Sequence, residues 1–305
     1  MGNCYDSFPI LYCLLITVMT KVVLKHQTYY EYDRAVFLGP HFLRLRPAPH
    51  CPVPISRYFL QVLGVEHSLH WLQDPYGNFQ ARVTFPSPTK VLNIEVEVEA
   101  EIRPVNPFNF FVEAYAAKYP FNYEPALEKE LGLFLERNES GILLQKYVDK
   151  FVKKEVYITD FLCSLNQSLR ETVEYSQRLE DGVQSCEETL EKQVGSCRDT
   201  SWLLVQMLRH YGLAARFVSG YLIQLVSADN SPDGVKKDSA DLHAWAEVYL
   251  PGAGWIGIDP TSALLTAEGH IPLACTATPE RAAPVTGSRE VCDCRLDFSL
   301  QVLRL

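Results

Sequence analysis

The chain has 305 residues, of which 47% are hydrophobic and 21% are charged, so it is long enough for two domains with substantial cores. Acidic residues outnumber basic ones by 37 to 28, which gives a formal net charge of −9. Because no run of Lys or Arg forms a basic stripe, the composition argues against nucleic acid as a partner. We expect a soluble globular protein.

An apolar run at residues 8–18 raises the question of export. Its 11 residues are too few to span a membrane and are typical of a signal-peptide core. However, Asp6 and no basic residue precede the run, and no small-residue cleavage site follows it. We therefore interpret residues 1–20 as a leader or upstream extension, with translation starting at Met19, and expect no membrane association.

Nine cysteines are present, an odd number without any C-x-x-C spacing. This fits neither a disulfide framework nor the common zinc motifs, and it favours a reducing, cytoplasmic location. Cys292 and Cys294 lie in an alternating segment, where a period of two places both thiols on one face of a strand. We expect both to be buried apolar residues rather than metal ligands.

Residues 21–105 contain short strand patterns that are separated by turn residues. The segment 94–102 alternates cleanly between apolar and acidic residues, and Asp74-Pro-Tyr-Gly-Asn is a strong turn signal. This pattern predicts an N-terminal antiparallel β domain. The row of glutamates on segment 94–102 is expected to be a solvated strand face rather than a cation site.

Helical patterns open the second part of the chain, residues 106–290. They cover residues 126–136, 143–152 and 158–173, and strand patterns follow at 214–225, 242–250 and 255–259. Residues 291–305 are predicted to form a C-terminal strand. The fold class is therefore α+β.

The segment 195–212 reads as a helix with both ends marked. Ser196 is a suitable N-cap, Asp199 completes a capping box with it, and Gly212 suits the C-terminal turn. Cys197 then lies in the first turn, where the helix dipole and unpaired N–H groups favour an anion and lower the pKa of a thiol. Taken alone, Cys197 is better explained as a core cysteine of an apolar helix than as a catalytic residue.

Two downstream residues favour a catalytic role for Cys197 over a role in the core. His243 opens the second predicted strand and Asp259 closes the third. Each alone is common at a strand end, but Cys197, His243 and Asp259 together supply a nucleophile, a base and a residue that orients the base.

Strand geometry sets a condition on this assignment. Paired residues of an antiparallel hairpin have numbers with a constant sum, and neighbouring residues alternate between faces. A four-residue loop at 251–254 would place His243 and Asp259 on opposite faces. We predict an odd-length loop or a bulge, which places them together, with Trp245 and Trp255 near the site as substrate-binding residues.

Three segments resemble a known family. They are Gly-Ser-Cys-Arg-Asp at 195–199, His-Ala-Trp-Ala-Glu-Val-Tyr at 243–249 and Gly-Trp-Ile-Gly-Ile-Asp-Pro-Thr at 254–261. In this order they resemble the three catalytic motifs of the papain-like transglutaminase-like superfamily. Leu-Arg-Leu-Arg-Pro at 43–47 and Gly-His-Ile-Pro-Leu-Ala-Cys at 269–275 further resemble a bacterial branch that carries its own N-terminal β domain.

The resemblance implies that Cys197, His243 and Asp259 form a catalytic triad in a papain-like core, in which a helix bearing the cysteine packs on an antiparallel sheet bearing the other two. It implies a protein or peptide amide as substrate and a thioester intermediate. This chemistry requires no cofactor, and we expect no metal site because no EF-hand-like spacing is present, although the sequence leaves calcium dependence open. Members of the branch are often followed by, or fused to, a much larger protein region, which is a further expected partner.

Two questions remain open at this level. If an amine resolves the thioester, the enzyme is a transglutaminase, and if water does, it is a peptidase or deamidase. A catalytically inactive protein-binding module is the alternative of a different class. Such modules commonly lose a triad member, whereas all three residues are present here.

Overall fold

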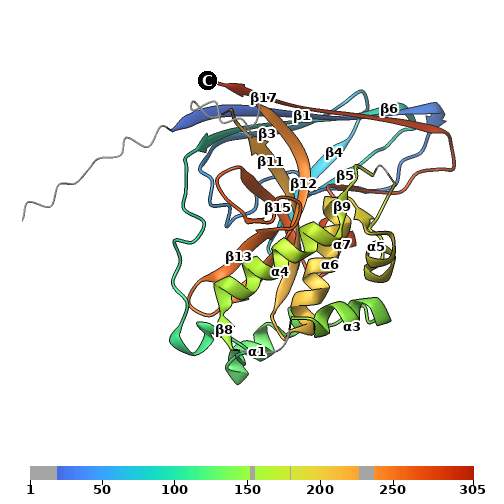
Figure 1. Ribbon diagram of the computed structural model, residues 1–305. Helices are drawn as coiled ribbons and strands as arrows, with labels where there is room; N and C mark the ends of the chain where they lie inside the picture. The colour runs from blue at the N-terminus through green and yellow to red at the C-terminus, as the bar shows by residue number, and fades with distance from the viewer. Residues whose placement is uncertain (1–18, 152–154, 179, 227–236) are drawn as a thin grey trace, which may run out of the picture.

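The computed structural model describes residues 19–151, 155–178, 180–226 and 237–305. The proposed leader therefore lies almost wholly outside the described residues. Figure 1 shows a β-rich part at the top and the helices below it, with the long strands β11 and β12 running from one part into the other. The predicted α+β class is confirmed.

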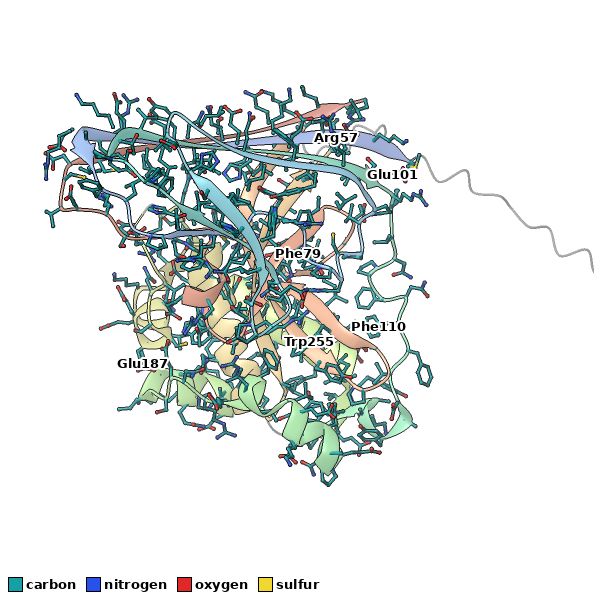
Figure 2. All side chains as sticks on the ribbon, turned by 180° about the vertical axis from the view of Figure 1, so that it is seen from behind. Arg57, Phe79, Glu101, Phe110, Glu187 and Trp255 are labelled. Carbon is teal, nitrogen blue, oxygen red and sulfur yellow. The ribbon has the colours of Figure 1, made fainter. Side chains whose placement is uncertain are left out.

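The outer sheet has four antiparallel strands in the order β17-β1-β6-β3. Their bounds are β17 (Cys294–Arg304), β1 (Thr20–Val36), β6 (Thr89–Ile102) and β3 (Ile55–Leu63). Along β6, buried aliphatic residues such as Val96 alternate with partly exposed glutamates, as predicted. Arg57, labelled in Figure 2, pairs with Glu99 at 3.3 Å on that exposed face, so the glutamate row is a solvated surface.

A second antiparallel sheet of four strands lies beneath the first, in the order β16-β2-β5-β4. Its strands are β16 (Val285–Thr286), β2 (His41–Leu43), β5 (Phe79–Thr84) and β4 (Ser68–Gln73). The predicted turn between β4 and β5 is confirmed: the Asp74 carboxylate accepts hydrogen bonds from the N–H groups of Tyr76 and Asn78, both at 2.9 Å. Because β16 and β17 complete these two sheets, the β-rich part is built from both ends of the chain.

The central sheet has five antiparallel strands in the order β14-β13-β12-β11-β15. The strands are β11 (Ala215–Gln224), β12 (Ser239–Leu250), β13 (Gly254–Asp259), β14 (Leu264–Leu265) and β15 (His270–Thr276). One face of its central strands packs on helix α6 (Cys197–His210) through residues such as Phe217, Ala246 and Val248. Burial of these residues fixes α6 on the sheet that carries His243 and Asp259.

The remaining helices surround α6. Their bounds are α1 (Pro125–Glu130), α2 (Gly132–Leu135), α3 (Ile142–Asp149), α4 (Ile158–Thr172), α5 (Cys186–Lys192) and α7 (Pro279–Ala282), with a 3₁₀ turn η1 (Ala114–Ala116). Short strands pair between them, β7 (Lys118–Tyr119) with β8 (Val156–Tyr157) and β9 (Glu174–Tyr175) with β10 (Val194–Gly195). The helix predicted at 126–136 is two short helices that meet at Leu131, before the helix-weakening Gly132.

Helix α5 was not foreseen, although its sequence carries a start signal. The Ser185 hydroxyl accepts a hydrogen bond from the N–H of Glu188, as an N-cap does. Glu187, labelled in Figure 2, reaches across to α3 and accepts hydrogen bonds from the N–H groups of Leu143 and Leu144 at 3.1 and 2.8 Å. One side chain of α5 therefore caps the start of α3.

The prediction for the C-terminal cysteines is wrong in part. The strand begins at Cys294, so Cys292 precedes it. Both side chains are only partly buried, and both pack against the core of the β-rich part. In the part of the chain that the structure describes, no helix is long and apolar enough to cross a membrane.

Candidate active site

The N-terminus of α6 is built around the carboxylate of Asp199. This group accepts hydrogen bonds from the N–H and hydroxyl of Ser196 at 2.8 and 2.7 Å and from the N–H of Gln184 at 2.7 Å, and it forms an ion pair with Arg178 at 3.1 Å. Burial acts to raise the pKa of Asp199, but these donors outweigh it and lower the pKa. Cys197, the first helical residue, is thus held in a rigid first turn, as predicted.

The hairpin between β12 and β13 has the geometry that the sequence required. Leu250 pairs with Gly254 and Ala246 pairs with Ile258, so three residues, 251–253, form the loop. This odd-length loop places the odd-numbered side chains of both strands on one face. The predicted condition for bringing His243 and Asp259 together is therefore met.

His243 lies between the other two residues of the triad. Its Nε2 atom is 3.1 Å from the Asp259 Oδ2 atom, and the Cys197 thiol is close enough to affect the pKa of the ring. Burial acts to lower the pKa of His243, but the hydrogen bonds and negative charges of Asp259 and Cys197 outweigh it and raise the pKa to about 10. The site therefore favours the imidazolium form of His243.

Asp259 is held as a carboxylate by several donors. Its Oδ1 atom accepts hydrogen bonds from the N–H and hydroxyl of Thr261 at 2.9 and 2.8 Å, and its Oδ2 atom accepts one from the Ser262 hydroxyl at 3.1 Å. Burial would raise the pKa of this group, but His243, His270 and Thr261 hold it well below its usual range. The residue is thus a permanent negative partner for His243.

The charge state of His243 gives a testable pH dependence of stability. Its pKa rises from 6.5 to about 10 in the folded protein, so protonation stabilises the fold fully below pH 6.5, and this contribution is lost as the pH rises towards 10. We expect the melting temperature of the wild type to exceed that of His243→Gln most at pH 6, with the difference shrinking by pH 10. A difference that grows with pH would contradict the imidazolium assignment.

Two family models match the chain at these elements. Residues 145–260 match the transglutaminase-like superfamily, and residues 22–101 match the bacterial transglutaminase-like N-terminal region. Residues 145–260 are therefore a transglutaminase-like superfamily core, preceded by a bacterial transglutaminase-like N-terminal region.

Bacterial proteins are similar to most of the chain. The uncharacterized proteins Mb2599c of Mycobacterium bovis and Rv2569c of Mycobacterium tuberculosis are each 26% identical over 260 residues, which is 81% of this chain and 80% of theirs. The crystal structure of a Cytophaga hutchinsonii protein named as a candidate cysteine protease superposes with a TM-score of 0.69 and 17% identity, covering 95% of this chain and 92% of that one. At that identity the structural likeness concerns the fold.

Within this transglutaminase-like core, His270 is a neighbour of the triad that the sequence reasoning did not single out. Its Nε2 atom lies 3.5 Å from the Asp259 Oδ2 atom. Its Nδ1 atom accepts a hydrogen bond from the N–H of Ala267 at 3.3 Å, so the ring proton of the neutral form is on Nε2 and points to Asp259. His270 lies in the segment 269–275, which resembles the bacterial branch but gives no sign by itself that this histidine lies near Asp259.

Trp245 is a buried support of the site. It is 1% exposed, and its ring lies edge-on to His270, with ring centroids 5.2 Å apart. The indole covers Gly220 on the neighbouring strand: a Cβ atom there would lie 2.4 Å from the Trp245 Cη2 atom and 2.4 Å from the Ile271 carbonyl oxygen. This placement does not bring Trp245 to a surface where substrate could touch it, so a substrate-binding role for it stays a prediction.

The close approach at Gly220 predicts a large cost for any side chain. Gly220→Ala is expected to destabilise the fold by roughly 2–3 kcal/mol, because neither the indole nor the Ile271 backbone has room to move. Gly132→Ala is the matched control, since its Cβ atom would meet nothing within 4 Å and should change stability by less than about 1 kcal/mol. Urea denaturation of both variants compares the two costs.

Trp255 does not lie at the triad, and the prediction that it would is wrong. It pairs with Tyr249, six residues along β12 from His243, which is about 20 Å at strand spacing. The Arg216 guanidinium lies over its ring, 4.3 Å from the ring centroid, and Phe134 meets the ring edge to face. Trp255 and His243 are both odd-numbered and share a face of the sheet, but their positions along the strands separate them.

Tyr175 is a second neighbour that sequence reasoning missed. It lies on β9 and pairs with Gly195, which precedes Cys197 by two residues. Its side chain is 49% exposed. Burial and the negative charges of Cys197, Asp241 and Asp259 raise the pKa of its phenol. Its hydroxyl therefore stays protonated at neutral pH.

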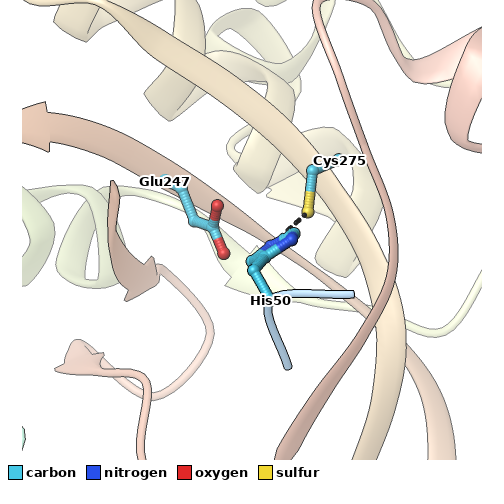
Figure 3. Close-up of side chains that lie close together, drawn as sticks. All are labelled: His50, Glu247 and Cys275. Atoms are coloured by element: carbon cyan, nitrogen blue, oxygen red, sulfur yellow. Dashed lines mark hydrogen bonds between the residues drawn. The ribbon is translucent and has the colours of Figure 1, made fainter. Parts of the chain in front are cut away.

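Two groups of side chains in the described residues have potential metal-ligand spacing, and the hydrogen bonds of both argue against a metal. In the first, His50, Glu247 and Cys275 converge (Figure 3), but the guanidinium of Arg216 already pairs with Glu247 at 2.6 Å and with the His50 Nε2 atom at 3.1 Å. A cation there would have to displace a buried positive charge.

The second group is His243, Asp259 and His270. A metal on the His270 Nε2 atom requires the ring proton on Nδ1, but that atom accepts a hydrogen bond from Ala267. His270 is therefore arranged as a hydrogen-bond donor to Asp259 rather than as a ligand.

Proposed function

We propose that this protein is a transglutaminase-like cysteine enzyme that cleaves amide bonds of proteins or peptides through a thioester on Cys197. The observation that carries the proposal is the Cys197–His243–Asp259 arrangement, with a 3.1 Å contact from His243 to Asp259 and the thiol at the first turn of α6. Free N–H groups at this helix end favour the negative charge of a thiolate and of an oxyanion.

The chemistry has two steps. The Cys197 thiolate attacks the amide carbonyl carbon, and the His243 imidazolium gives its proton to the departing nitrogen, which leaves as ammonia or an amine. The resulting thioester is then attacked by water, which gives a carboxylic acid, or by a primary amine, which gives a new amide, while His243 accepts the proton of the nucleophile. Asp259 keeps the ring oriented and balances its charge throughout.

Incubation with a library of glutamine-containing peptides, with and without a primary amine, tests the proposal. Mass spectrometry would detect loss of ammonia as a gain of about 1 Da for hydrolysis, or addition of the amine for transfer. Cleaved peptide backbones would identify a peptidase. Absence of all three products, together with an unreactive Cys197 thiol, would favour a protein-binding module instead.

A further inference from the structure

Helix α4 carries one polar residue in an otherwise apolar buried row. Its buried positions are Ile158, Phe161, Leu162, Leu165, Asn166 and Leu169. Asn166 is 1% exposed, and a leucine at this position would continue the apolar pattern. A buried amide on the core side of a helix calls for a specific explanation.

The amide nitrogen of Asn166 binds the backbone at the end of β13 and at the start of β14. It donates hydrogen bonds to the carbonyl oxygens of Asp259 at 3.1 Å and of Leu264 at 3.3 Å. The Oδ1 atom, in contrast, has no hydrogen-bond partner among the described residues. Burying an unpaired acceptor opposes folding, so core packing alone does not account for an asparagine here.

The segment that Asn166 holds is a tight turn between β13 and β14. Asp259 and Leu264 are the paired residues at the end of this hairpin, and Asn166 bonds to both of them. Within the turn, Ala263 has a φ of 61°, a conformation that is unfavourable for a residue with a Cβ atom. A turn with such local strain gains from an external anchor.

We propose that Asn166 is a positioning residue that fixes the backbone of Asp259 and, through Asp259, the orientation of His243. This rests on the function proposed above. With the Asp259 carbonyl tied to α4, and α4 packed in the same core as α6, the carboxylate and the Cys197 helix keep a constant separation. Thr261 and Ser262 cannot fix this separation, because their hydrogen bonds to Asp259 lie within the turn and move with it.

Substitution of Asn166 by Leu separates this role from simple packing. Leu has a similar size and suits the apolar row, but it donates no hydrogen bond. Loosening of Asp259 weakens the contact that raises the pKa of His243, so the His243 midpoint should fall from about 10 by about one unit. Alkylation of Cys197 by iodoacetamide at pH 7 should slow by about five- to tenfold, because the imidazolium, which stays protonated at this pH, is held less firmly in the orientation that stabilises the thiolate.

The experiment uses the full chain labelled with ¹⁵N-histidine, with His243 assigned by comparison with His243→Gln. Leu169→Ala is the matched control: it removes buried apolar atoms from the same helix, so it should lower the melting temperature without moving the His243 midpoint. In an Asp259→Asn background, Asn166→Leu should have no further effect on alkylation, since it acts through Asp259. If Asn166→Leu does not fold, Asn166→Ala takes its place with the same expectations.

The outcomes separate this inference from the proposed function. A wild type with a raised His243 midpoint that Asn166→Leu leaves unchanged would overturn the positioning role and leave the triad intact. An equal shift in Leu169→Ala, or an additive effect in the Asp259→Asn background, would also overturn it. A wild type with an ordinary His243 midpoint and a slowly alkylated Cys197 would instead remove the proposed function, and the inference with it.

Discussion

Cys197→Ala is expected to abolish turnover of every amide substrate, by at least about 10⁴-fold, while the fold stays intact. The sulfur is the atom that forms the thioester, and no other residue of the triad can replace it. The side chain is only partly buried at the start of α6, so its loss leaves a small cavity at most. Initial rates on the peptide identified by the library screen, together with circular dichroism, measure both effects.

Cys163→Ala provides the control for this first prediction. Cys163 is also partly buried and lies on α4, and burial raises the pKa of its thiol, so it stays protonated and unreactive. The variant should keep full activity. An enzyme that remains active after Cys197→Ala would end the proposed mechanism.

The second large effect concerns the two residues that activate the thiol. His243→Ala should reduce turnover nearly as much as Cys197→Ala, because it removes both the partner of the thiolate and the proton donor for the leaving nitrogen. Asp259→Asn should cost less, about 10²- to 10⁴-fold, since the amide still accepts a hydrogen bond but no longer balances the imidazolium charge. Kinetics from pH 5 to 10 distinguish the two roles.

The dependence of activity on pH tests the role assigned to Asp259. The negative charge of Asp259 helps to raise the pKa of His243 to about 10, so in Asp259→Asn the alkaline limit of activity should move to lower pH. Equal activity of Asp259→Asn and wild type across the whole range would show that Asp259 has no part in catalysis.

Local signals in the sequence predicted where the residues of the candidate triad lie in the fold, while their catalytic role rested on the family resemblance. Ser196, Asp199 and Gly212 mark the ends of α6, so the position of Cys197 in its first turn followed from capping rules alone. The face shared by His243 and Asp259 followed from strand parity once the loop between their strands was required to have odd length.

The supports of the site could not be predicted in the same way. Asn166 meets the Asp259 carbonyl across 93 positions of the chain, and no local pattern indicates which turn a buried amide will contact. His270 begins a strand that joins the sheet beside β11, so its proximity to Asp259 depends on strand order. The prediction that Trp255 lies near the triad was wrong because the odd or even number of a residue fixes its face of the sheet but not its distance along the strand.

The measurement that tests the central claim most directly is the order in which the cysteines react with limiting iodoacetamide at pH 7, mapped by mass spectrometry. Burial raises the pKa of Cys51 to about 11 and those of Cys186 and Cys275 well above the ordinary value, so these thiols should react slowly. Cys197, beside the His243 imidazolium, should be labelled ahead of all others in the wild type and lose this preference in His243→Ala. Labelling of Cys197 that is no faster than that of the buried thiols, or that is unchanged in His243→Ala, would contradict a catalytic Cys–His pair.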